Sequence, residues 1–219
     1  MTRDSELRPA QEPGVGLMIR PVRPGDEEAV LALIAALAEY EREPEAVETS
    51  VTDLTSAFFP TDREPLAHAF VAERTAAAGV APGAGGPGRT AGADLVRADL
   101  VGIAVWFVTF STWTGKHGIW LEDLFVDPTF RGTGCGRALM RELARECVRR
   151  DYARLDWAVL DWNTPAQGFY RSLGARPMDE WTSWRVDGDG LHALAADAAP
   201  IHRADAARPA PDVREEDGG

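Results

Sequence analysis

The sequence is short of the residues that build several common kinds of protein site. It has only two cysteines, Cys135 and Cys147, with no C-x-x-C pair and no clustered His/Cys set, so we expect neither a disulfide framework nor a metal site. No segment approaches the ~20 apolar residues of a membrane span. Residues 1–14 contain no hydrophobic core and do not resemble a secretory signal. We therefore expect a cytoplasmic protein with no metal and no membrane partner.

Positive charge is also scarce. The chain of 219 residues carries 23 Lys and Arg against 35 Asp and Glu, a formal net charge of −12. Proteins that bind nucleic acid usually present a basic patch, so we expect no nucleic-acid partner. The acidity suits a cationic small substrate, although acidity that only keeps a protein soluble explains it at least as well.

Apolar periodicity predicts one α/β domain at residues 17–190 with a mixed sheet that is antiparallel in its first half. The expected helices are 26–41, 52–58, 134–150 and 165–173, with Asp26 capping the first and Thr52 or Asp53 the second. The expected strands are 17–22, 66–73, 100–110, 118–126, 154–160, 175–178 and 181–186. Polar or Gly/Ala-rich composition predicts disordered tails at 1–16 and 191–219 and a flexible insertion at 76–98.

The most informative stretch is R-G-T-G-C-G-R, residues 131–137, between an expected strand and an expected helix. Glycines at such a turn let the backbone approach a ligand, and the N-terminus of the following helix attracts anions such as phosphate. The stretch lacks the G-K-[ST] ending of a P-loop and lies too late in the chain for a dinucleotide-binding turn. Taken alone, the three glycines are equally consistent with a plain tight turn.

The surrounding sequence resembles the GNAT superfamily of N-acetyltransferases over residues 19–186. Residues 131–136 match its [R/Q]-x-x-G-x-[G/A] signature in full. The stretches L-A-E-Y-E, W-L-E-D-L-F-V-D-P-T-F-R-G-T-G-C-G and D-W-N-T-P-A-Q-G-F-Y-R-S-L-G-A are similar to the diamine (spermidine/spermine) and thialysine acetyltransferase branch. The resemblance implies the GNAT acyl-CoA N-acyltransferase fold, a mixed and mostly antiparallel twisted sheet that splays around an acetyl-CoA slot and is flanked by helices.

The resemblance also implies which residues hold acetyl-CoA, the expected co-substrate. Backbone amides of the glycine turn bind its pyrophosphate, three strand residues pair with its pantetheine arm, and an asparagine touches it at the start of a helix. These residues are Arg131, Gly132, Thr133, Gly134, Cys135, Gly136 and Arg137; Leu124, Phe125 and Val126; and Asn163. We assign Cys135 no catalytic part.

Two residues are implied to be catalytic. Tyr170 would be the general acid, since a phenol with a pKa of ~10 stays protonated at neutral pH and can donate to the departing sulfur. From its F-Y spacing alone, core packing is the better interpretation. Glu122 would bind the amine or remove its proton through water. Regular strand alternation would turn Glu122 and Asp123 to opposite faces, so we expect one of them to face the cleft, with Asp123 the alternative. A solvent-exposed strand end explains most such acidic pairs.

Further substrate contacts are implied at Tyr40, Glu41, Asp156 and Trp157. Acidic residues beside aromatic ones suit an ammonium group through charge and cation–π attraction. The transfer of Asp156 rests on its position rather than on its residue type, and core packing explains Trp157 equally well.

The expected function is acetyl transfer from acetyl-CoA to a small diamine, polyamine or lysine-like amine. Two alternatives stay open: acetylation of another amine, such as an amino acid, a drug or a protein N-terminus, and a non-catalytic acyl-CoA-binding module. The branch resemblance also implies a homodimer, for which Trp181 and Trp184 are candidate interface anchors.

Overall fold

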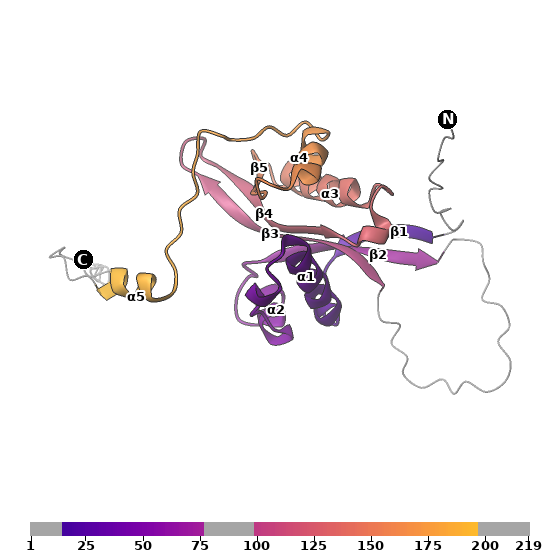
Figure 1. Cartoon of the computed structure of the whole chain (residues 1–219), viewed down its shortest axis with the longest axis horizontal. Coiled ribbons are helices and arrows are strands. Elements are labelled where there is room, and N and C mark those ends of the chain that lie inside the picture. The colour runs from indigo at the N-terminus through magenta and orange to yellow at the C-terminus, as the bar shows by residue number, and fades with distance from the viewer. Residues whose placement is uncertain (1–14, 77–98, 197–219) are drawn as a thin grey trace, which may run out of the picture. The chain divides into compact units, whose positions relative to one another are not determined.

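The computed structural model describes residues 15–76 and 99–196, and these contain a five-stranded sheet flanked by helices (Figure 1). The strands lie in chain order across the sheet. The first four pair antiparallel, and the fifth pairs parallel to the fourth. The strands are β1 (Val15–Pro21), β2 (His68–Ala76), β3 (Leu100–Ser111), β4 (Lys116–Val126) and β5 (Leu155–Trp157). The predicted mixed, mostly antiparallel sheet is confirmed.

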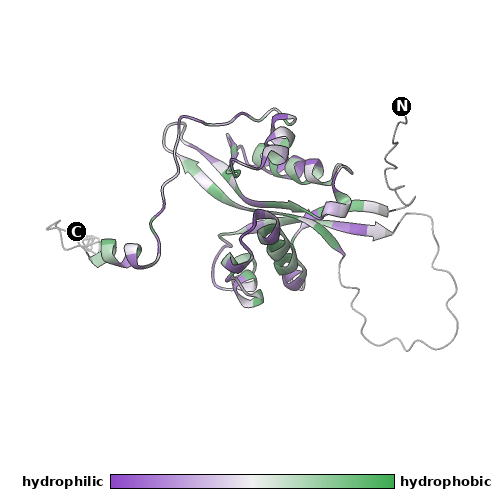
Figure 2. Ribbon diagram, viewed as in Figure 1, coloured by the Kyte–Doolittle hydropathy of each residue, from purple (hydrophilic) through white to green (hydrophobic). Residues whose placement is uncertain are grey.

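Helices cover both faces of this sheet (Figure 1). One face carries α1 (Glu27–Glu41) and α2 (Val51–Phe58), and the other carries α3 (Cys135–Arg149) and α4 (Thr164–Arg171). Two short 3-10 helices, η1 (Pro44–Ala46) and η2 (Pro128–Phe130), complete this part. Hydrophobic residues run along the central strands (Figure 2). Neighbouring residues of β3 belong to opposite cores: Ile103 packs in the cluster on the α1 face, and Ala104 packs in the cluster on the α3 face.

The boundaries of three predicted segments need correction. The strand expected at 66–73 begins at His68 and continues to Ala76, and the strand expected at 154–160 is limited to Leu155–Trp157. Strand β1 begins at Val15, within the expected N-terminal tail. The remainder of that tail and residues 77–98 of the expected insertion lie outside the described residues.

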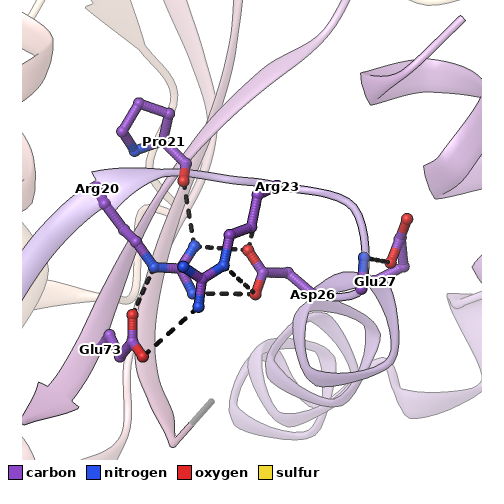
Figure 3. A network of polar contacts seen from close by, with 7 residues as sticks. Arg20, Pro21, Arg23, Asp26, Glu27 and Glu73 are labelled. Carbon is purple, nitrogen blue, oxygen red and sulfur yellow. Dashed lines mark hydrogen bonds and ion pairs between the residues drawn. The ribbon is translucent and has the colours of Figure 1, made fainter. Parts of the chain in front are cut away.

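The residue expected to cap α1 lies at the N-cap position, but its side chain has a different role. Asp26 precedes the helix but makes no side-chain cap bond, because its carboxylate accepts two hydrogen bonds from Arg20, at 2.6 and 3.0 Å (Figure 3). The guanidinium of Arg20 also donates to Glu73, at 2.5 Å. This network ties β1, β2 and the start of α1 together. Helix α2 is capped by Ser50, whose side chain forms a capping box with Asp53.

A β-bulge in β4 positions the candidate acidic residues. Val105 of β3 lies opposite Asp123 and Trp106 lies opposite Leu121, so Glu122 is an extra residue without an opposite partner. The bulge shifts the alternation of the strand by one residue. Before it, Leu121 packs in the cluster on the α3 face, and after it Leu124 packs there too. Phe125 packs on the α1 face, and Asp123, two residues earlier, lies on that face with it.

Strands β4 and β5 part immediately before the bulge. Their pairing ends at Leu121 and Trp157, and β4 continues to Val126. The last five residues of β4 therefore have no strand partner on the β5 side among the described residues. The parting of these two strands that the resemblance implies is therefore present.

The chain divides after Gly174 into a second unit, which is described by itself. The strands expected at 175–178 and 181–186 are absent, since a strand needs a neighbour for its backbone groups. Among residues 175–196 of this unit, the regular structure is the helix α5 (Gly188–Ala196). The helix also corrects the disordered tail expected from residue 191, of which residues 197–219 lie outside the described residues. A single domain that reaches residue 190 stays a prediction.

Candidate active site

The glycine turn between η2 and α3 has the backbone that the sequence predicts. Gly132 and Gly134 have φ values of 78° and 91°, a region that favours glycine. A Cβ atom built on either residue meets no atom within 4 Å, so the backbone dihedrals and not a lack of space call for glycine here. Gly134 is the N-cap of the 15-residue helix α3, whose first amides have no partner inside the helix. The first amides of α3 are therefore free of helical partners at this turn.

The other residues of this turn hold it in place. Thr133 donates its hydroxyl to the carbonyl of Phe130, at 2.7 Å. A Cβ on Gly136 would lie 3.4 Å from the ring of Phe169, at an ordinary van der Waals distance, so α3 and α4 are in contact here. Arg137 donates to the hydroxyl of Ser172 just after α4, at 3.1 Å.

Cys135 begins α3 and is almost completely buried. Burial raises the pKa of its thiol to about 11, so the sulfur carries a proton at neutral pH. A thiol in this state is a poor nucleophile, which agrees with the absence of any catalytic part for it.

Helix α4 begins across the slot from the last residues of α1. Asn163 is buried, and its side-chain oxygen caps α4 by accepting from the amide of Ala166, at 3.2 Å. The same oxygen accepts from the hydroxyl of Tyr40 at the end of α1, at 3.1 Å. This hydrogen bond between Tyr40 and Asn163, which are 123 residues apart, joins the end of α1 to the helix that carries Tyr170. The end of α1 is where the resemblance implies contacts with the amine.

Tyr170 packs beside the core on the α3 face, with its ring 4.9 Å from that of Trp157. Burial, with a smaller contribution from the charge of Glu41, raises the pKa of Tyr170 to about 12. The phenol is therefore fully protonated at neutral pH. Trp157 packs against the ring of Tyr170 with the two ring planes tilted by 49°, so the packing role considered for Trp157 is present.

Asp123 is the most strongly perturbed carboxyl group of the site. Burial, followed by the charges of Glu122 and Glu41, raises the pKa of Asp123 to about 6. Burial also raises the pKa of Glu41. Glu122 is exposed and accepts a hydrogen bond from the indole of Trp120, at 2.9 Å. The regular alternation assumed for these two acids does not hold, because the bulge falls at Glu122 and Asp123 lies within electrostatic reach of Glu41.

Asp156 has a partner of its own. Its carboxylate lies 2.7 Å from the guanidinium of Arg154, on the same strand region. Because of this ion pair, much of the negative charge of Asp156 that could attract an amine is neutralised by Arg154.

Two arginines and two aromatic rings stack across the mouth of the slot. The guanidinium of Arg131 lies 4.6 Å from the ring centroid of Tyr40, and that of Arg42 lies 4.9 Å from the ring centroid of Trp162. The rings of Tyr40 and Trp162 are 6.1 Å apart. Neither Arg42 nor Trp162 was predicted from the sequence to belong to the site. Trp162 lies in the D-W-N-T-P stretch, next to Asn163. Its position beside a predicted site residue is the signal that could have indicated Trp162 as a site residue.

A separate groove of about 290 Å³ lies where β1 ends and β2 begins, and none of the site residues discussed above lines it. Its walls include Phe58, His68, Trp106 and Arg150. Within residues 15–76 and 99–196, no three His, Cys, Asp or Glu residues are grouped as a metal site would require. No helix in the same ranges has the length and apolar character needed to span a membrane.

Comparisons with known proteins agree with this geometry. The model of the acetyltransferase (GNAT) family matches residues 34–175. Thialysine N-epsilon-acetyltransferase of Sus scrofa is 33% identical over 182 residues, which cover 82% of this chain and 97% of that protein. Human spermidine/spermine N(1)-acetyltransferase-like protein 1 is 27% identical over 77% of this chain and 22% of that protein. An integron cassette protein of V. cholerae shares the fold, with a TM-score of 0.56 and 24% identity over 82% of this chain and 98% of that one. The chain belongs to the GNAT family of acetyltransferases.

Proposed function

We propose that this chain transfers the acetyl group of acetyl-CoA directly to the primary amine of a small cationic substrate, such as a diamine, a polyamine or a lysine-like amino acid. The observation that carries the proposal is that Glu41 lies within electrostatic reach both of Asp123, in the part of β4 that β5 does not pair, and of Tyr170 on α4. Two carboxyl groups beside a buried phenol suit an ammonium-bearing substrate and a proton transfer. The names of the thialysine and spermidine/spermine relatives support an acceptor of this class.

The glycine turn and the free edge of β4 fit acetyl-CoA. Amides around Gly132 and Gly134 would hold the pyrophosphate at the N-terminus of α3, where the helix dipole favours an anion. The backbone of Leu124, Phe125 and Val126 would pair with the pantetheine arm, in the place that β5 leaves free. When bound, acetyl-CoA supplies an acetyl thioester as the acyl donor.

The carboxyl groups would hold the amine and accept its proton. The amine must lose a proton before its nitrogen can attack the carbonyl carbon. Asp123 suits this step better than the more exposed Glu122, since its pKa of about 6 makes it a stronger base than an ordinary aspartate. We therefore assign proton acceptance, directly or through one water, to Asp123. Glu122 would bind the second charge of a longer amine at the mouth of the slot.

Tyr170 would complete the reaction as general acid. As the carbon–nitrogen bond forms and the carbon–sulfur bond breaks, the departing sulfur takes the proton of the phenol. The acetylated nitrogen gives up its second proton to water, and the phenolate regains a proton from water, which leaves a neutral amide and free coenzyme A. A pKa of about 12 keeps that proton in place at every pH at which the enzyme folds and works. Trp157, which packs on the ring, and Asn163, which caps α4, would fix the direction of the hydroxyl.

A thiol-release assay with acetyl-CoA tests the function. The acceptors are thialysine, L-ornithine, spermidine, 1,3-diaminopropane, an aminoglycoside and a peptide with a free N-terminus. We expect turnover with the first four and little with the last two. Turnover limited to the aminoglycoside or the peptide would refute the proposed substrate class. Tight coenzyme A binding without turnover of any acceptor would indicate a non-catalytic module.

Substitution of Tyr170 by phenylalanine tests the mechanism. Tyr170→Phe keeps the ring that packs on Trp157, so both KM values should change little while kcat falls. General acid assistance is worth ~10²–10⁴-fold, and because a thiolate is a fair leaving group we expect the low end, ~10²-fold. A kcat equal to that of the parent would show that Tyr170 only packs.

We further propose that the enzyme is a cytoplasmic homodimer. Trp181 and Trp184 of the second unit are exposed to 69% and 92%, and such large apolar side chains are enriched at subunit interfaces.

A further inference from the structure

Arg131 belongs to the glycine turn, yet its guanidinium contacts the opposite side of the site. It lies over the ring of Tyr40 at 4.6 Å and near the ring of Phe125 at 5.9 Å. Its Nε donates to the carbonyl of Val126, at 3.3 Å. The side chain thus bridges the end of β4 and the end of α1.

Tyr40 carries this connection further into the site. Its hydroxyl donates to Asn163, which caps the helix that bears Tyr170. The next residue after Tyr40 is Glu41, whose charge contributes to the raised pKa values of both Asp123 and Tyr170. A shift of Tyr40 would therefore move Asn163, which caps α4, and the neighbouring carboxyl group of Glu41. The charge of Glu41 acts on the proposed acid and on the proposed base.

Arg137 provides an internal comparison. It lies in the same turn, but its guanidinium donates to Ser172 behind α4, away from α1. The two arginines can therefore affect binding of coenzyme A alike while differing in their effect on the amine side.

We infer that Arg131 is a positioning residue that couples the two substrates: binding of coenzyme A at the turn fixes its guanidinium, which fixes Tyr40 and Glu41 for the amine. The inference rests on the proposed function. It predicts that each substrate tightens the binding of the other, by the same factor in both directions. Cation–π contacts at exposed sites are worth ~0.5–1 kcal/mol, which corresponds to a factor of about two to five.

The test is calorimetric titration of the protein with coenzyme A, which carries no acetyl group to transfer. The titration is done with and without a saturating amine, which is thialysine, or spermidine if spermidine is turned over faster. The measured quantity is the ratio of the two dissociation constants. We expect a ratio of about two to five in the parent and a ratio near one in Arg131→Met, in Tyr40→Leu and in the double variant. Tyr40→Phe keeps the ring and should retain most of the ratio. Arg137→Met should weaken coenzyme A binding under both conditions and leave the ratio unchanged.

Several outcomes separate this inference from its alternatives. A ratio near one in the parent, or a parental ratio in Arg131→Met, would overturn it, because a purely structural or purely cofactor-binding arginine changes affinity without changing the ratio. If Tyr40→Leu does not fold, Arg131→Gln and Arg131→Lys give the same comparison, with partial retention expected for lysine. Failure of the proposed function is distinct, since no amine of the panel would then be acetylated, whereas failure of the coupling alone leaves turnover intact.

Discussion

Replacing Asp123 by asparagine should stabilise the folded protein more at alkaline pH than at acidic pH. The pKa of the Asp123 carboxyl rises from 3.8 to about 6 on folding, first because of burial and then because of the charges of Glu122 and Glu41. Below pH 3.8 a carboxyl group whose pKa is raised on folding does not lower the free energy of unfolding, because it is protonated in both the folded and the unfolded state. The folded state loses stability as the pH rises from there through about 6. The shift corresponds to roughly 3 kcal/mol, fully expressed above pH 6.

Urea-induced unfolding of the parent and of Asp123→Asn at pH 5 and pH 8 measures this effect. Linkage predicts that about half of the full penalty develops between these two pH values, so the advantage of the variant should grow by between roughly 1 and 2 kcal/mol. In thermal unfolding the same gain is a shift of about 2–8 °C for a chain of this size. Any constant cost of the substitution, such as altered packing, cancels in the comparison between the two pH values.

Glu122→Gln is the matched control. It leaves Asp123 in place but removes one of the charges that raise its pKa, so the pH-dependent penalty of the parent should shrink without disappearing. If the difference between the parent and Asp123→Asn is the same at pH 5 and pH 8, Asp123 is not a desolvated carboxyl group. Its assignment as the proton acceptor would then lose its physical basis.

Three further predictions concern the turn, the buried ion pair and assembly. Gly134 has a φ of 91°, which costs a β-branched residue ~1–3 kcal/mol. Gly134→Val should therefore raise the KM for acetyl-CoA about tenfold and the KM for the amine much less. Gly134→Asn should raise the KM for acetyl-CoA by a smaller factor. Asp26→Asn should lower the free energy of unfolding by ~3 kcal/mol at pH 7, because it leaves Arg20 with Glu73 alone. Burial opposes ionisation of Asp26, but its bonds to Arg20 outweigh this and lower its pKa, so the loss should fade as the pH falls below 3.8. Light scattering should give twice the chain mass, and the double substitution of Trp181 and Trp184 by serine should give a monomer; a monomeric parent would refute the dimer.

The parts of the fold that the sequence predicts well are those fixed by local periodicity. Val30 and Leu33 lie on the apolar stripe that predicts the first helix, and both are buried in the structure. The expected helix 26–41 differs from the observed one by a single residue. The turn at Gly132 and Gly134 was also predictable, because a positive φ leaves a direct mark on residue choice.

The parts that escaped prediction depend on partners far away in the chain. The alternation of Glu122 and Asp123 is reset by a bulge, and a bulge is defined only by the register of β4 against β3. By its position Asp26 looks like a residue whose side chain caps a helix. In the folded sheet, however, Arg20 binds Asp26 and also Glu73, which lies 53 residues after Arg20 in the chain. Strand-like composition at 175–186 could not show whether a neighbouring strand is available.

The bulge matters for the chemistry because the proposed acid and base respond to the same two influences. Burial and the negative charge of Glu41 raise the pKa of Tyr170, which keeps the phenol as a proton donor. They also raise the pKa of Asp123, which makes that carboxylate a better proton acceptor. Regular alternation would have turned Asp123 away from Glu41 and left only the more exposed Glu122 on this face. One extra residue in β4 therefore places Asp123 where burial, with the charges of Glu122 and Glu41, raises its pKa in the direction that a proton acceptor requires.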